Sequence, residues 1–174
     1  MSFVTSDHEE FRNAVRRFTE EEIVPIASEL DAKNAEIPME IIAKMAEQGY
    51  FGVLFPEEYD GLGLDNITMT IVAEELSKGW LSVGSVMTRG VIMGTLLQAH
   101  GTEEQKKKYL PGLATGTILP AAAFTEPDSG SDSASMIMKA TKTEGGYLLN
   151  GAKAWCTYAN RANVLMVLAR TNPD

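Results

Sequence analysis

Apolar residues recur every three or four positions through residues 1–117, which is the spacing of helices that bury one face. Ser6 and Glu9 have the spacing of a capping box and predict the start of a first helix. Pro25 predicts a kink or an end near Val24, because proline has no backbone N–H for the helical ladder, and the helix is expected to resume briefly beyond it. The inward face of the helix is expected to consist of Phe11, Val15 and Phe18.

Two further helices follow a similar pattern. Pro38 predicts the first residue of the second helix, and Gly49 is expected just beyond its end. Residues 50–64 contain proline and glycine and predict a loop. Asp65 or Asn66 is expected to cap a third helix. This helix reaches about residue 78, with Ile67, Ile71, Val72 and Leu76 on its buried side.

A fourth helix is predicted over about residues 82–100, and it is apolar on nearly every side. Such a helix is typically central in its bundle. It carries a single cation, Arg89, for which two partners are open: Glu74 or Glu75 on the preceding helix, or a carboxylate on a ligand. A fifth helix is predicted to begin at a capping box of Thr102 and Gln105 and to reach about residue 114.

From residue 118 the hydrophobic period changes, and short strands are predicted. Asn150-Gly151 is a strong two-residue hairpin signal, and a second turn is expected at Gly145-Gly146. The predicted strands are residues 119–124, 135–143, 147–149, 153–155 and 164–169. The fold class is therefore α+β, with a helical bundle over residues 1–117 and the first strands of a β-barrel-like domain over residues 118–174. Because a small open sheet is poorly stable alone, the β domain is expected to be incomplete.

Charge is distributed unevenly. The net charge is −9, with 10 Lys and Arg against 19 Asp and Glu in residues 1–118, and 5 of each in residues 119–174. An acidic surface repels phosphate backbones, so a nucleic-acid partner is not expected. No apolar run approaches the length of a membrane span, and the start of the chain lacks a signal-peptide pattern, so a cytoplasmic protein is expected.

The few residues with metal or thiol chemistry carry little signal. Cys156 is the single cysteine, so no disulfide can form within the chain. No basic neighbour in the sequence activates it as a nucleophile. His8 and His100 lack metal-ligand spacing, and no metal site is expected.

The candidate chemistry lies in residues 119–157. A loop rich in Gly, Ser and Asp follows a short apolar run, and it offers hydroxyl and backbone donors without fixed charge. Trp155 offers a flat apolar surface nearby. Together these features predict a site for a flat, oxygen-bearing ligand. The alternative is structural: Thr125 and Ser131 as turn residues, Trp155 as core and Cys156 as a buried thiol.

Two motifs in this region resemble the flavin-site signatures of the acyl-CoA dehydrogenases. The first is FTEPDSGSD at residues 124–132, and the second is NGAKAWCT at residues 150–157. The resemblance extends to PEEYDGLGL at residues 56–64 and to GTEEQKKKYLPGLATG at residues 101–116. It implies an FAD-dependent oxidoreductase that removes hydrogen from Cα and Cβ of an acyl-CoA, with electron-transfer flavoprotein as acceptor and a homotetramer as the complete enzyme.

The resemblance also implies roles for individual residues. Those expected at the FAD are Phe124, Thr125, Gly130, Ser131, Trp155, Cys156 and Thr157. Ser131 is expected near the thioester ligand as well, whereas the counterpart of Glu126 is structural. The helical half is similar to dehydrogenases of methylsuccinyl-CoA and related acids, which favours Arg89 as a substrate residue.

The catalytic base of the family lies in a C-terminal domain, so no catalytic residue is expected in this chain. The chain is accordingly expected to be the N-terminal portion of a dehydrogenase, inactive alone, or a piece paired with a separate C-terminal chain. A non-catalytic binding remnant and an acyl-CoA oxidase-like fragment remain as alternatives.

Overall fold

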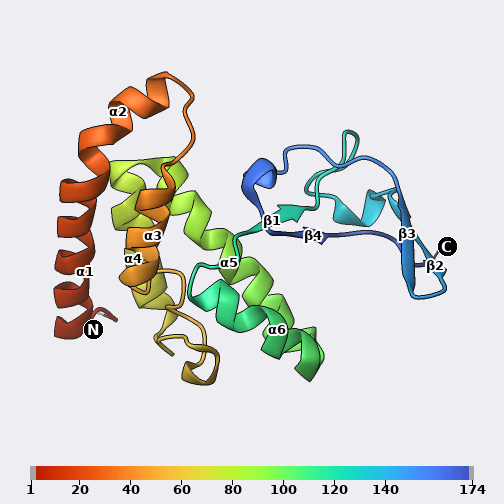
Figure 1. Cartoon of the computed structure of the whole chain (residues 1–174), viewed down its shortest axis with the longest axis horizontal. Helices are drawn as coiled ribbons and strands as arrows, with labels where there is room; N and C mark the ends of the chain where they lie inside the picture. The colour runs from red at the N-terminus through yellow and green to blue at the C-terminus, as the bar shows by residue number, and fades with distance from the viewer. Residues whose placement is uncertain (1–2, 173–174) are drawn as a thin grey trace. The chain divides into compact units, whose positions relative to one another are not determined.

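The computed structural model describes residues 3–172 of the chain (Figure 1). Contacts divide it into two compact units, Met1–Ile118 and Leu119–Asp174. The first unit is helical, and the second contains short strands. This confirms the α+β class that the change of hydrophobic period predicts.

The helical unit contains six α-helices among the described residues. Their bounds are α1 Ser6–Phe18, α2 Val24–Ala32, α3 Met39–Glu47, α4 Asn66–Gly79, α5 Leu81–His100 and α6 Glu103–Ala114. A π-helical turn at Thr19–Ile23 joins α1 to α2, and a 3-10 turn at Glu57–Tyr59 lies in the loop before α4. The largest fully buried side chains include Val15, Ile42, Met45, Phe55, Ile71, Leu76, Met87, Leu110 and Leu113. The predicted inward face of α4 is therefore largely confirmed.

The cap of α1 differs from the prediction by one residue. Thr5, rather than Ser6, is the N-cap, and its hydroxyl accepts from the His8 backbone N–H at 3.3 Å. The His8 ring completes the box, because Nδ1 accepts from the Thr5 N–H at 3.1 Å. Nε2 then donates to Asp65, 3.1 Å away, so one histidine links the caps of α1 and α4. The Ser6 and Glu9 prediction is wrong because a ring nitrogen replaces the usual glutamate.

Pro25 is accommodated rather than ending the helix. The Val24 N–H bonds to the carbonyl of Thr19, five residues back, which is the wider spacing of a π turn. Proline then occupies the first turn of α2, where a missing N–H costs little. The predicted kink near Val24 is thus present as a π turn.

Other helix ends follow their sequence signals. Asp65 caps α4 through the Thr68 N–H, and Thr102 and Gln105 form the predicted capping box of α6. Gly49 adopts φ +73° just beyond α3, a conformation that glycine tolerates best. Pro38 is the N-cap of α3 rather than its first residue, so the helix begins at Met39, one residue later than predicted.

Helix α5 is not surrounded on all sides. It packs against α4 and α6 through Val83, Val86, Met87, Met93 and three glycines. Leu81, Ile92 and Leu96 are exposed on another face. Within the described residues, one face of α5 is therefore exposed. The expectation that α5 is central in its bundle is wrong for this face.

A buried carboxylate ties α1 to α4. Glu75 accepts hydrogen bonds from Arg12, Arg16 and Lys78 at 3.0–3.1 Å. These donors, led by Arg16, lower the pKa of the buried Glu75 carboxyl to about 2. Glu75 is therefore ionised, and its oxygens are already bound by three cations. It does not pair with Arg89.

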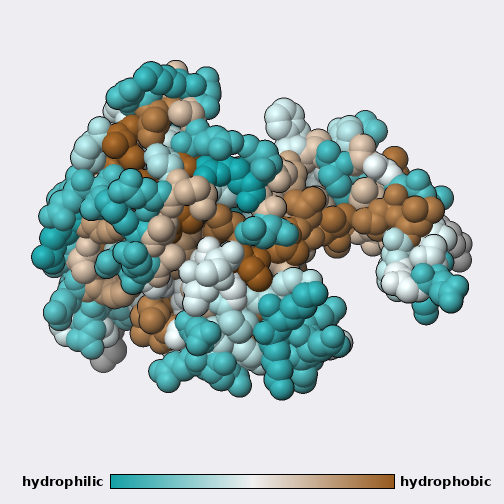
Figure 2. Space-filling view, viewed as in Figure 1, coloured by the Kyte–Doolittle hydropathy of each residue, from teal (hydrophilic) through white to brown (hydrophobic). Residues whose placement is uncertain are grey.

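The described residues of the second unit form two two-stranded sheets. Strand β1 (Pro120–Ala123) pairs in parallel with β4 (Val164–Val167), with Pro120 opposite Val164. Strand β2 (Lys139–Thr143) pairs antiparallel with β3 (Gly146–Asn150). Apolar side chains remain on the surface along β4 and the β2–β3 hairpin (Figure 2), notably Tyr147, Leu148, Leu149 and Leu165.

The hairpin lies where the second turn was expected, not at Asn150-Gly151. Glu144 and Gly145 connect β2 to β3, and Gly145 takes φ +83°. Residues 153–155 form no strand, because the Ala154 N–H donates instead to the carbonyl of Thr125. The predicted Asn150-Gly151 hairpin is therefore wrong, since a tertiary bond takes the donor that its second strand would need.

Candidate functional site

The two motifs come together in the second unit. The Ala154 N–H donates to the Thr125 carbonyl at 2.9 Å. The Lys153 ammonium donates to the Phe124 carbonyl at 2.9 Å and to Glu126 Oε1 at 2.8 Å. Segments that are nearly 30 residues apart in the sequence therefore form one loop pair at the end of β1.

Glu126 is the anchor of this loop pair. Its side chain is 2% exposed, and it also accepts from the backbone N–H groups of Ile137 and Met138 at 2.7 and 2.9 Å. The Ile137 N–H, the Lys153 ammonium and the Met138 N–H lower the pKa of the Glu126 carboxyl to about 2. These contacts agree with the structural role that the resemblance implies for Glu126. Lys153 did not stand out in the sequence, because its partners lie on a distant segment.

The glycine-rich loop is held at both ends. Ser129 exchanges backbone bonds with Glu126, and its hydroxyl donates to the Asp132 carbonyl at 2.7 Å. Further along, the Arg170 guanidinium donates to the carbonyls of Met136 and Ala134. The tip between these ties, Gly130 and Ser131, is exposed.

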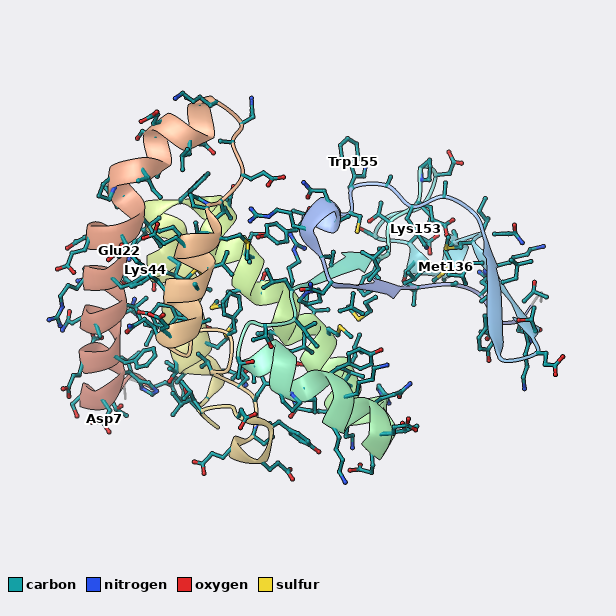
Figure 3. The ribbon with its side chains drawn as sticks, in the orientation of Figure 1. Asp7, Glu22, Lys44, Met136, Lys153 and Trp155 are labelled. Atoms are coloured by element: carbon teal, nitrogen blue, oxygen red, sulfur yellow. The ribbon has the colours of Figure 1, made fainter. Side chains whose placement is uncertain are left out.

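Trp155 projects from the loop pair rather than packing into a core. Its side chain is 88% exposed, and Figure 3 shows it directed away from the ribbon while Lys153 lies inside the loop. Its backbone takes φ +56°, a left-handed conformation that costs a non-glycine residue about 1 kcal/mol or more. The core alternative for Trp155 is therefore wrong within the described residues. An exposed indole on a strained backbone is typical of a binding surface.

The hydroxyl donors of the two motifs are not used by the fold. Within residues 3–172, the side chains of Thr125, Ser131 and Thr157 form no hydrogen bond with the protein, so neither Thr125 nor Ser131 acts as a turn residue through its hydroxyl. A Cβ added to Gly130 would meet no atom within 4 Å. Cys156 is half-buried, and its carbonyl accepts from the Ala159 N–H. The loops that carry the two motifs therefore present neutral donors, an open glycine and an exposed flat ring.

Arg89 lies apart, in the helical unit. One terminal nitrogen donates to the Ser85 hydroxyl at 2.9 Å, and its buried Nε has no hydrogen-bond partner. The predicted pairing with Glu74 or Glu75 is wrong, because Arg12, Arg16 and Lys78 already bind those carboxylates.

Neither a metal site nor a membrane-spanning helix is present in the described part of the chain. Between residues 3 and 172, no cluster of His, Cys, Asp and Glu has the geometry of a metal site. Over the same range, no helix combines the length and the apolarity that crossing a bilayer requires.

Comparison with known proteins agrees with both motifs. Residues 5–117 match the model of the acyl-CoA dehydrogenase N-terminal domain, and residues 121–174 match that of the acyl-CoA dehydrogenase middle domain. Among curated proteins, the chain is 44% identical to (2S)-methylsuccinyl-CoA dehydrogenase of Cereibacter sphaeroides, over 94% of this chain and 30% of that protein.

Solved structures give the same picture. A glutaryl-coenzyme A dehydrogenase in complex with glutaryl-CoA is 34% identical, with a TM-score of 0.92 over 99% of this chain and 45% of that one. A structure described as the electron transferring flavoprotein of Acidaminococcus fermentans, in work on flavin-based electron bifurcation, is 35% identical with a TM-score of 0.92, over 99% and 46%. The chain spans less than half the length of these relatives. With both family models matched, the chain belongs to the acyl-CoA dehydrogenase family.

Proposed function

We propose that this chain supplies the FAD-contacting loops of a flavin-dependent acyl-CoA dehydrogenase. The observation that carries the proposal is the joined loop pair at Glu126 and Lys153, which carries unused hydroxyls and an exposed indole. FAD, when bound, would supply the acceptor for the hydride that leaves Cβ of the thioester.

The residues of the loop pair would divide the binding. The Phe124 backbone and the hydroxyls of Thr125 and Thr157 would donate to or orient the polar edge of the ring system. Trp155 would cover one side of the ring, with Cys156 next to it. The open position at Gly130 would let phosphate or thioester oxygens approach the backbone, and Ser131 would donate to them. None of these groups carries a charge, so their polar contacts with the ring would be neutral hydrogen bonds.

We assign no catalytic base within the chain. Glu126 is the carboxylate of the flavin loop, but three donors hold it ionised, with a pKa of about 2. A general base works best with a pKa near the operating pH, so Glu126 is unsuited to take the α-proton. Its role is to position Phe124 and Thr125 through Lys153.

The wider assignment rests on the resemblance to the family. An acyl-CoA thioester would be the substrate, electron-transfer flavoprotein the acceptor, and a homotetramer the complete enzyme. The similarity to the methylsuccinyl-CoA and glutaryl-CoA enzymes named above supports, as the substrate of this protein, a short acyl group that carries a second carboxylate.

The test is an FAD titration that follows tryptophan fluorescence. Trp155 is exposed and Trp80 is buried, so quenching reports mainly on the loop pair. We expect weak, saturable quenching. Thr125→Val should weaken FAD binding about 2- to 10-fold, because one hydrogen bond contributes about 0.5–1.5 kcal/mol. Trp155→Phe should reduce the quenching while retaining a flat surface.

Two controls separate the loop pair from the rest of the unit. Thr143→Val removes an exposed hydroxyl on β2, and Tyr147→Ala removes an exposed aromatic ring on β3. Both should leave FAD binding unchanged. Equal losses in the control and loop variants, or no FAD binding by the unmodified chain, would reject the proposed site.

A further inference from the structure

The His8 ring joins the N-terminal ends of two helices. It is mostly buried, with 13% of the side chain exposed. Nε2 lies 3.1 Å from Oδ2 and 3.3 Å from Oδ1 of Asp65, the N-cap of α4. Nδ1 lies 3.1 Å from both the backbone nitrogen and the hydroxyl oxygen of Thr5, the N-cap of α1. Within residues 3–172, these two caps supply all the hydrogen-bond partners of the ring.

These contacts determine which ring nitrogen carries the hydrogen. The Asp65 carboxylate accepts from the Thr68 N–H and the Thr68 hydroxyl, both at 2.8 Å, and these bonds lower the pKa of the Asp65 carboxyl. An ionised carboxylate can only accept, so Nε2 must carry a hydrogen. Nδ1 of the neutral ring is then an acceptor, and the Thr5 N–H donates to it. The neutral ring therefore serves both helix caps with a single tautomer.

A second proton on the ring breaks one of these bonds and keeps the other. With hydrogen on both nitrogens, Nδ1 can no longer accept from the Thr5 N–H. The Thr5 hydroxyl oxygen, also 3.1 Å away, becomes the acceptor within reach. At Nε2, the contact with Asp65 becomes an ion pair. Protonation thus removes the hydrogen bond of the Thr5 N–H and adds charge to the link with α4.

The other charged groups of these two helices have partners of fixed charge. On α1, Asp7 and Glu9 flank the ring, and Arg12 lies one turn beyond it. On α4, Glu74 and Glu75 both bind Arg12. Within residues 3–172, no acid of the loop before α4 forms an ion pair with α1. Histidine is the side chain that changes charge between pH 5 and pH 8, and the second histidine of the sequence is on α5.

We propose that His8 is a pH-sensitive joint between α1 and α4. Neutral His8 completes the capping box of α1. Protonated His8 releases the Thr5 N–H, so the segment before α1 loses its anchor, while the ion pair with Asp65 holds the two helix starts together. A positive charge in the first turn of a helix opposes the helix dipole, and the Asp65 carboxylate offsets that cost. The joint includes none of the residues proposed to contact FAD, so it is independent of the proposed function.

The first test is an NMR titration of the unmodified chain from pH 8 to pH 5. At pH 8 we expect the ring nitrogen shifts of His8 to show hydrogen on Nε2 and none on Nδ1. As pH falls, the Thr5 amide signal should move with the same midpoint as the ring nitrogens. Hydrogen exchange of the Thr5 amide, relative to its intrinsic rate at each pH, should become about 2- to 10-fold faster, the range for one lost hydrogen bond.

Helix α6 supplies the design of a variant that cannot titrate. Its capping box uses Gln105, whose side chain accepts from the Thr102 N–H at 2.9 Å. His8→Gln should therefore keep the Thr5 amide bonded at every pH and abolish its pH-dependent shift. His100→Gln removes the other histidine, on α5, and is the matched control that should leave the Thr5 shift unchanged.

A third variant tests the link to α4. Asp65→Ser keeps a hydroxyl that can cap α4 but removes the carboxylate that faces Nε2. The neutral His8 ring should then populate both tautomers. The proposal is overturned if neutral His8 carries its hydrogen on Nδ1, if the Thr5 amide does not follow the ring, or if His8→Gln keeps the pH-dependent shift. The titration of the unmodified chain needs no substitution, so it decides the question when a variant fails to fold.

Discussion

Single residues decide the geometry of the loop pair. Glu126 is a buried carboxylate with three protein donors, whereas Trp155, 29 positions further along the chain, is exposed on a left-handed backbone. The Glu126 carboxylate has its hydrogen-bond partners within the protein, whereas the Trp155 ring is not packed against the protein. This contrast suggests that Glu126 holds the loop pair together and that Trp155 is available to a ligand.

Glu126 should make the stability of the second unit depend on acid. Its pKa is lowered from 4.5 to about 2, so its stabilising contribution is present above about pH 4.5 and is lost as pH falls towards 2. Glu126→Gln should therefore speed hydrogen exchange at the Ile137 and Met138 amides near neutral pH, and its difference from the unmodified chain should shrink across that acidic window. Glu75 titrates in the same window in both proteins and cancels. Glu144→Gln, at an exposed turn, is the matched control, and an equal effect there would contradict the assignment.

At the scale of elements, helix ends and turns follow local chemistry where no distant group competes. The capping box of Thr102 and Gln105 lies where the sequence predicts it, whereas that of α1 shifts to Thr5 because the His8 ring reaches both Thr5 and Asp65. Asn150-Gly151 fails as a hairpin for a similar reason, since Ala154 bonds to Thr125. Cap and turn motifs therefore predict the structure correctly unless a residue distant in sequence binds the hydrogen-bonding groups involved.

Two glycines of α5 should respond oppositely to alanine. A Cβ at Gly94 would lie 2.3 Å from the buried Phe55 ring, whereas one at Gly90 would meet its nearest atom at 3.9 Å. Gly94→Ala should destabilise the protein by about 1–3 kcal/mol through overpacking. Gly90→Ala should be neutral or stabilise it by up to about 1 kcal/mol, because alanine favours the helix. Urea unfolding measures both, and similar values for the two variants would show that α5 packing is not specific to Gly94.

For the whole molecule, the two units differ in how much apolar surface they bury. The helical unit has a core of fully buried side chains from α1 to α6. The described residues of the second unit form two two-stranded sheets and leave Tyr147, Leu148 and Leu165 exposed. Small sheets with open edges and exposed apolar residues are marginal in water.

The units should therefore differ in independent stability. A chain of residues 1–118 should remain helical and unfold cooperatively with heat, whereas residues 119–174 alone should lack a cooperative transition. Circular dichroism and amide chemical-shift dispersion measure both. A cooperative transition in residues 119–174 alone would mean that the two small sheets suffice for a stable fold.

Much of this protein follows from its sequence. Apolar periodicity and caps determine the helices, because helical hydrogen bonds and buried faces are local in sequence. The motifs at residues 124–132 and 150–157 indicate the family, because each is a short continuous segment of the chain. Tertiary structure alone decided that Lys153 binds Glu126, that Glu75 excludes Arg89, and that Trp155 is exposed. These outcomes depend on which charged and polar groups reach each other across distant segments, and no local pattern records that competition.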